Sequence, residues 1–159
     1  MTGMSKFLAA AIALAMAAPA FAIEVKKHVV VNATPEAAWA AIGDFCGIST
    51  WHPAVAGCAL TKEGKKTLRT LSLNGGGTIV ERMTRWDDAK MRYSYIILSG
   101  PLPVANYHST LSVHAGRKGT VIRWSGTFDA KDAPDDKATE AIAGVYDSGL
   151  AALVKKLGG

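Results

Sequence analysis

Alternating apolar and polar residues fill the middle of the chain, and this two-residue period predicts β-strands. Short runs of turn-forming residues separate the strands, with the sequences EGKK, NGGG, DDAK, SGPLP and GRKG. Because links this short join antiparallel neighbours, we expect one antiparallel sheet. The predicted strands of this block are Cys58–Lys62, Thr67–Leu73, Thr78–Trp86, Met91–Leu98, Val104–His114 and Thr120–Phe128.

The segment before this block predicts a further strand and two short helices. Glu24–Asn32 is a β-branched run, and Thr34 follows it as the N-cap of a helix expected over Pro35–Phe45. Two glycines weaken the helical pattern near the end of this helix, and Trp51–Pro53 then forces a turn. We therefore expect the helical region to be broken into two short pieces.

The end of the chain predicts a long amphipathic helix over Pro134–Leu157. Aspartates stand at its start and lysines at its end, which suits the helix dipole. Its apolar face is formed by Ile142, Tyr146, Leu150, Leu153 and Leu157. Because only this helix is long enough to cover the sheet, the predicted fold class is α+β.

Composition narrows the classes of protein that fit. The chain has 159 residues, of which 49% are hydrophobic and 19% are charged. This size suits one globular domain, and the composition excludes a mainly disordered chain. The formal charge is +5, but lysines and arginines are scattered among the acidic residues. We therefore expect no nucleic-acid partner.

Residues 1–22 have the pattern of a secretory signal peptide. Lys6 supplies a positive start, Phe7–Ala18 is an uncharged apolar run, and Ala20–Ala22 has the small-x-small form of a cleavage site. The run is too short for a transmembrane helix, so we expect no stable membrane insertion, and an uncleaved anchor is the alternative. The expected mature domain is residues 23–159, located in the periplasm or outside the cell.

Export changes the interpretation of the two cysteines. Cys46 and Cys58 form an even pair, and an oxidising compartment allows them to form a disulfide. Two buried free thiols are the alternative.

Several motifs resemble the polyketide cyclase/dehydrase and lipid-transport family, which belongs to the START-like or Bet v 1-like superfamily. They are Asn32–Cys58, the R-L-L…GG…I-E pattern within Arg69–Glu81, and Thr120–Phe128 followed by the long helix. The resemblance implies a helix-grip fold, in which a curved seven-stranded antiparallel sheet wraps around the C-terminal helix and an apolar cavity lies between them. The signal pattern with Gly100–Tyr107 also resembles periplasmic accessory proteins encoded with bacterial methanol-oxidation genes, and secreted relatives of unknown role.

Arg69 and Glu81 are the strongest candidates for polar site residues. They are equidistant from Gly75 in the NGGG turn, so a hairpin centred there places them opposite each other. Leu71, Leu73, Ile79 and Met83 have the same parity, which makes this face apolar and turns it toward the expected cavity. A buried carboxylate and guanidinium require each other, so the pair either orients a ligand or forms a structural ion pair. A different register would place both in solvent.

Aromatic residues on the later strands are the second group of candidates. The resemblance places Tyr107 and Trp124 where plant hormone receptors of the superfamily line their pocket, and alternation adds Tyr95 and Ser109 to the inner side. These residues either contact a ligand or simply form the core. The full expected lining is Trp51, His52, Arg69, Leu71, Glu81, Met83, Tyr95, Tyr107, Ser109, Trp124 and Tyr146. The proline-containing SGPLPV loop is expected at the cavity rim.

His52 could serve as an acid or base near the cavity mouth, but no nucleophile or orienting partner is evident, and a structural role is favoured. The other histidines lack metal-ligand spacing. We assign no catalytic residue, metal or cofactor.

Three functions fit these features. The leading one is an exported binding protein that holds a small apolar or aromatic molecule under the long helix. The alternatives are a cyclase or dehydratase that uses the same cavity, and a periplasmic accessory protein that assists a dehydrogenase and its electron acceptor, with a periplasmic redox protein as its partner.

Overall fold

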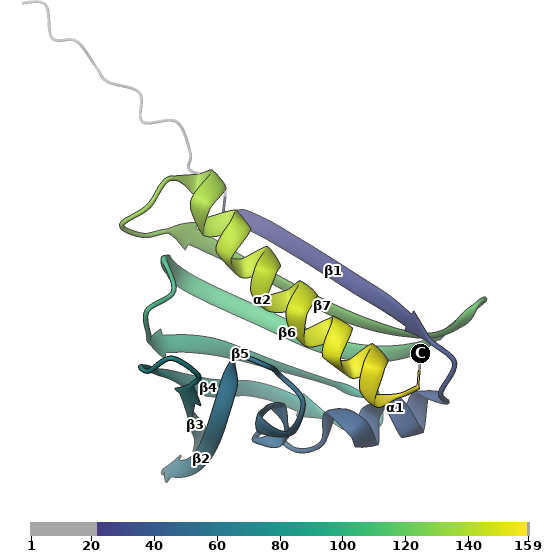
Figure 1. Cartoon of the computed structure of the whole chain (residues 1–159). Helices are drawn as coiled ribbons and strands as arrows, with labels where there is room; N and C mark the ends of the chain where they lie inside the picture. The colour runs from purple at the N-terminus through teal and green to yellow at the C-terminus, as the bar shows by residue number, and fades with distance from the viewer. Residues whose placement is uncertain (1–21, 159) are drawn as a thin grey trace, which may run out of the picture.

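The computed structural model describes residues 22–158, which form one seven-stranded antiparallel sheet and a long C-terminal helix (Figure 1). The strand order is β1-β7-β6-β5-β4-β3-β2, so the first and last strands of the chain are neighbours. This confirms the predicted α+β helix-grip class. The strands are β1 Ile23–Val31, β2 Val55–Glu63, β3 Lys66–Leu73, β4 Thr78–Asp87, β5 Arg92–Ser99, β6 Val104–Gly116 and β7 Gly119–Ala130.

Helix α2, Asp135–Lys156, crosses the inner face of the sheet and lies closest to β1 and β7 (Figure 1). Two aspartates occupy its first turn and two lysines its last turn, as the helix dipole favours. Its buried face consists of Ala138, Ile142, Tyr146, Gly149, Leu150 and Leu153. The strands farthest from β1 therefore lie beyond the main contact with the helix, and this arrangement leaves room for a cavity.

The region between β1 and β2 contains α1, Pro35–Ile42, and a 3₁₀ turn, η1, Gly47–Thr50. The predicted N-cap is confirmed, since Thr34 Oγ1 accepts a hydrogen bond from the Ala37 amide at 3.2 Å. The predicted helix end at Phe45 is wrong. The helix stops at Ile42 because Gly43 has a φ of 76°, which is incompatible with a continuing α-helix.

Strand β2 begins earlier than its pattern predicts. The expected start was Cys58, but pairing with β3 already begins at Val55, opposite Leu73. A β-bulge between Val55 and Gly57 shifts the register, and this extra residue hides the two-residue period from the sequence.

A disulfide joins Cys46, just before η1, to Cys58 on β2, which confirms the predicted pairing. It ties the helical segment to the edge of the sheet. None of the helices between residues 22 and 158 has the length and hydropathy of a membrane span. Of the predicted signal peptide, residues 1–22, all but Ala22 lie outside the described part of the chain.

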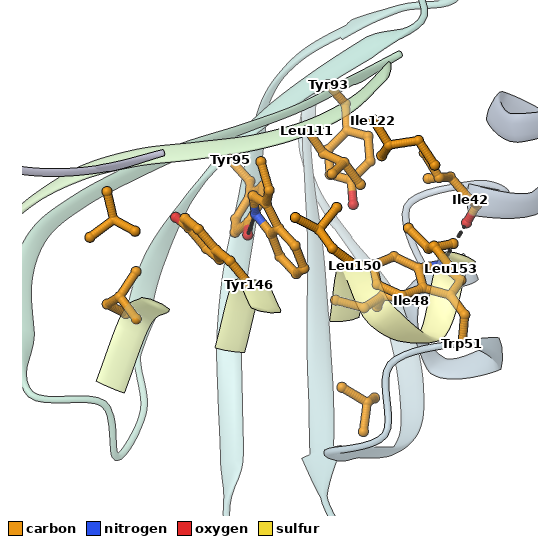
Figure 2. Packing of buried hydrophobic residues seen from close by; sticks show 14 of the residues in the cluster. Ile42, Ile48, Trp51, Tyr93, Tyr95, Leu111, Ile122, Tyr146, Leu150 and Leu153 are labelled. Carbon is orange, nitrogen blue, oxygen red and sulfur yellow. Dashed lines mark hydrogen bonds between the residues drawn. The ribbon is translucent and has the colours of Figure 1, made fainter. Parts of the chain in front are cut away.

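Part of the apolar core lies where α1 and the last turns of α2 meet the sheet. Figure 2 shows Leu150 and Leu153 of α2 directed toward Leu111 and Ile122 of the sheet. Trp51 closes this region, and its indole donates a hydrogen bond to the Ile42 carbonyl at 3.0 Å (Figure 2). This hydrogen bond also satisfies a carbonyl left open where α1 ends.

Candidate functional site

A cavity of about 130 Å³ lies between the sheet, the η1–β2 loop and α2. Strands β3 to β7 supply its walls, the loop before β6 contributes Leu102, and Val145 reaches it from α2. Its lining is predominantly apolar. The complete lining is Ile48, His52, Ala54, Val55, Leu71, Leu73, Ile79, Glu81, Tyr95, Leu102, Tyr107, Trp124 and Val145.

The cavity has a partly exposed mouth and a buried inner end. Ala54, Leu73, Leu102 and Val145 retain contact with solvent and mark the mouth. The inner end is buried and carries the polar groups, which are Glu81, Tyr95, Tyr107 and the Trp124 indole. A ligand that enters therefore meets apolar side chains first and hydrogen-bonding groups last.

Arg69 and Glu81 face each other across β3 and β4, in the register that the NGGG turn predicts. Arg69 Nε donates to Glu81 Oε2 at 2.5 Å, and the two residues are 0% and 4% exposed. Arg69 Nη1 donates a second hydrogen bond to the Phe45 carbonyl. The guanidinium also lies over the Phe45 ring at 4.1 Å and the Tyr95 ring at 4.9 Å. Arg69 is thus held by a carboxylate, a carbonyl and two aromatic faces.

The pair is electrostatically coupled. Burial is the largest single influence and lowers the pKa of Arg69, but the charge and hydrogen bond of Glu81 together with Tyr93 and Tyr95 outweigh it, so the pKa of Arg69 is raised. Burial raises the pKa of Glu81, and the guanidinium opposes that increase. Arg69 therefore stays charged, and Glu81 is the member of the pair that can accept a proton.

The aromatic residues share one hydrogen-bond network. Trp124 Nε1 lies 3.0 Å from the Tyr95 hydroxyl and 3.1 Å from Ser109 Oγ. The Tyr146 hydroxyl lies 3.0 Å from Ser109 Oγ and 2.6 Å from the Tyr107 hydroxyl. The Trp124 and Tyr146 rings stack with centroids 4.7 Å apart. This network fixes the orientation of three lining residues, Tyr95, Tyr107 and Trp124.

Two glycines permit this close packing. A Cβ on Gly126 of β7 would collide with the Tyr146 hydroxyl, so the bare backbone lets Tyr146 approach the sheet. A Cβ on Gly149 of α2 would lie 2.6 Å from His52 Cδ2 and 2.7 Å from Trp124 Cζ3. The helix can approach the cavity wall at this point only because Gly149 lacks a side chain.

His52 is held by hydrogen bonds on both ring nitrogens. The Ala54 amide donates to Nδ1 at 3.2 Å, which makes Nδ1 an acceptor and leaves Nε2–H to donate to the Val145 carbonyl at 3.0 Å. Burial lowers its pKa, and the charge of Arg69 adds to the decrease against the effect of the Val145 hydrogen bond. His52 is therefore neutral and connects the η1–β2 loop to α2.

The predicted site residues fall into two groups. Those that line the cavity are His52, Leu71, Glu81, Tyr95, Tyr107 and Trp124. The others lie around it: Arg69, Ser109 and Tyr146 contact lining residues from behind, and Trp51 packs against His52 and Trp124. Met83 pairs with Tyr95 on the neighbouring strand and is half-buried, but it does not border the cavity.

The predicted list of lining residues omits part of the apolar lining. Leu73 and Ile79 were expected on the cavity-facing side from their parity but were not included in that list, and the structure places both in the lining. Leu102 lies in the SGPLPV loop that was expected at the rim. Val145 gives no such signal, because it lies beside the buried stripe of α2 and not on it. Across residues 22–158, no group of three or more His, Cys, Asp or Glu side chains is placed to bind a metal ion.

Residues 22–158 match the sequence profile of the family described as polyketide cyclase / dehydrase and lipid transport. The chain belongs to this family. The predicted family is thereby confirmed, and its fold is one that binds small hydrophobic ligands. The narrower resemblance to periplasmic accessory proteins stays a prediction. No curated protein sequence matches the chain.

Solved structures of the family agree with this assignment. XoxI from Bacillus cereus is 32% identical, with a TM-score of 0.79 over 84% of this chain and 94% of that chain. An uncharacterised protein from Bacillus thuringiensis is also 32% identical, with a TM-score of 0.80 over 86% of this chain and 100% of that chain. The Zhui aromatase/cyclase from Streptomyces sp. R1128 is 18% identical, with a TM-score of 0.72 over 87% of this chain and 94% of that chain, and shares the fold.

Proposed function

We propose that this family member is an exported binding protein that holds one small, mostly apolar ligand in the cavity beneath α2. The observation that carries the proposal is the cavity itself, which is walled mainly by apolar side chains and has a buried ion pair at its inner end. Such a combination of apolar walls and a few polar groups is typical of small-molecule sites.

The cavity size limits the ligand. Its volume is about 130 Å³, and an apolar cavity of ~150 Å³ is large enough to bind benzene. Pockets for drug-sized ligands are larger, at roughly 300–1,000 Å³. The proposed ligand is therefore about the size of a single ring, and a multi-ring polyketide or a long acyl chain exceeds the space.

Binding is favoured over catalysis because of how His52 is held. A general acid or base must exchange a proton with the substrate, whereas both His52 nitrogens are occupied by backbone partners. The lowered pKa of His52 also removes the charged form at neutral pH.

Export is part of the proposal. The signal pattern in residues 1–22 supports it, as does the Cys46–Cys58 disulfide, since disulfides persist in oxidising compartments. Intact-mass measurement of protein recovered from outside the cytoplasm should give a chain that starts at Ile23. A retained Met1 would contradict export.

Filling the cavity tests the binding function. Val145→Phe places a ring at the mouth, so toluene binding measured by calorimetry should be lost while the protein remains folded. Val30→Phe is the matched control, because Val30 on β1 is exposed and lies outside the cavity lining. It should leave binding unchanged. Equal toluene affinity in both variants, or no binding in the wild type, would overturn the proposal.

A further inference from the structure

The hydroxyl protons in the network around the inner end of the cavity can be traced one by one. Ser109 Oγ donates its single proton to the Ser125 carbonyl at 2.9 Å. It must therefore accept from the Tyr146 hydroxyl, 3.0 Å away, because a serine hydroxyl has one proton only. Tyr146 has then used its own proton and must accept from Tyr107 at 2.6 Å. Every hydroxyl proton in this part of the network is assigned.

Tyr95 is left with an unused proton. Its hydroxyl oxygen accepts from Trp124 Nε1, and no group within residues 22–158 accepts the Tyr95 hydroxyl proton. Tyr95 is 2% exposed and lines the cavity. A buried donor without an acceptor destabilises the protein, so the cavity offers this proton to whatever occupies it.

Glu81 provides an acceptor at the same end. The one hydrogen bond that the described residues donate to its carboxylate comes from Arg69 and reaches Oε2, which leaves Oε1 available. Glu81 lines the cavity together with Tyr95. The two residues are close, since both contact the Arg69 guanidinium, Glu81 by its hydrogen bond and Tyr95 by its ring face at 4.9 Å, and they lie on neighbouring strands β4 and β5.

We infer that the ligand is a neutral ring compound with a hydroxyl group, of which phenol is the simplest. The ligand O–H donates to Glu81 Oε1, and the ligand oxygen accepts the Tyr95 proton. The ring packs against the apolar side chains of the cavity, such as Leu71 and Ile79. This inference rests on the proposed binding function and specifies the chemical class of its ligand.

Charge and hydrogen bonding set the selectivity. Arg69 balances the charge of Glu81, so the ion pair gives no net attraction for a charged ring, and burying an anion such as benzoate in the apolar cavity is costly. A methyl ether accepts from Tyr95 but has no proton for Glu81. A hydrocarbon of equal size makes neither hydrogen bond, and both polar groups then remain unpaired.

Calorimetric titration of the purified protein with phenol, toluene and anisole tests this inference. Phenol should bind about tenfold more tightly than anisole, which lacks the hydrogen bond to Glu81, and up to about a hundredfold more tightly than toluene, which makes neither hydrogen bond. Tyr95→Phe removes one of the two hydrogen bonds, so it should reduce the preference for phenol over toluene about tenfold and leave toluene affinity unchanged. Tyr93→Phe is the matched control, because Tyr93 is equally buried on β5 but lies outside the cavity lining, and it should preserve the preference.

The outcomes separate the two proposals. If toluene, anisole and phenol bind equally to the wild type, the proposal that the ligand carries a hydroxyl group is wrong, and the proposed binding of a small apolar ligand stands. An undiminished preference for phenol over toluene in Tyr95→Phe would likewise reject the assigned donor. If none of the three binds, both proposals fail. The ligand series on the wild type decides the question even if Tyr95→Phe does not fold.

Discussion

The two ends of the interface between α2 and the sheet are built differently. At the C-terminal end of α2, Leu150 and Leu153 are fully buried in the apolar core cluster (Figure 2). At the middle of α2, Tyr146 meets a network of hydroxyls, and the cavity begins beside it. One end supplies stability, and the other holds polar groups in fixed positions at the expense of packing.

The largest expected effect concerns the ion pair at the cavity end. Glu81→Leu leaves a buried guanidinium that cannot lose its proton, and breaking such a pair typically destabilises by ~3–5 kcal/mol. Arg69→Met should destabilise less, because burial already raises the pKa of Glu81 and the lone carboxyl can become neutral. The double variant Arg69→Met/Glu81→Leu should be close to wild type. Urea unfolding measures the free energy of unfolding of all four proteins.

The exposed pair Lys137–Glu140 serves as the control for these melts, and its removal should leave the unfolding midpoint unchanged. Equal, small effects in the Arg69 and Glu81 variants would contradict a buried pair.

A matched truncation compares the packing of the two ends. Leu153 is 0% exposed at the C-terminal end of α2, and Leu71 is 2% exposed in the cavity wall. Leu153→Ala should destabilise by ~4 kcal/mol, whereas Leu71→Ala should destabilise by ~2 kcal/mol, because one side of Leu71 already lacks partner atoms. Thermal and urea melts test the difference. A larger loss of stability for Leu71→Ala than for Leu153→Ala would mean that the cavity wall is at least as well packed as the core around Leu153.

Most of the fold follows from local patterns, and the errors have identifiable causes. The NGGG turn fixes the register of β3 and β4, which is why Arg69 and Glu81 could be paired from the sequence. The end of α1 and the start of β2 were misplaced because a positive φ at Gly43 and a bulge near Gly57 interrupt the periodic pattern. Both features depend on tertiary packing, which periodicity does not report.

The site was predicted less completely. Parity identifies which face a strand residue occupies, so Leu71 and Tyr95 were placed correctly on the cavity lining, and the family resemblance placed Tyr107 there. Parity cannot tell where along that face the cavity lies, so Met83 was included although it borders another part of the core. Trp51 was included because of its position in the loop before β2, and it packs behind the lining. The volume left under α2 depends on the close approach at Gly126 and Gly149, which is a property of the folded molecule.

A substitution on α2 tests that close approach. Gly149→Ala forces a methyl group against His52 and Trp124, and such overpacking typically destabilises by ~1–3 kcal/mol. Gly144→Ala is the control on the same helix. A Cβ at Gly144 meets no atom within 4 Å, so this change should stabilise by up to about 1 kcal/mol through helix propensity. Thermal unfolding should show a lower midpoint for Gly149→Ala and a higher midpoint for Gly144→Ala. Stabilisation by both changes would show that the helix has room for a methyl group at Gly149.

The smallest expected effect is a pH dependence that His52 contributes at the boundary between the two ends. Its pKa in the folded protein lies below the ordinary value of 6.5, chiefly because of burial, while the unfolded chain returns to that value. The unfolded state therefore binds the proton first as the pH falls. The stability from His52 is complete above about pH 6.5 and declines below it, by at most about 1.4 kcal/mol per pH unit for one proton.

Urea melts between about pH 8 and pH 5.5 avoid the range in which ordinary carboxyl groups titrate. The wild type should lose stability over this range, and His52→Gln, which cannot titrate, should lose less. Protonation must also disrupt the bond from the Ala54 amide to Nδ1, so the protection of the η1–β2 loop amides, measured relative to their intrinsic exchange rates, should fall at the lower pH in the wild type alone. Identical pH profiles for the two proteins would mean that His52 keeps the same pKa in the folded and unfolded states.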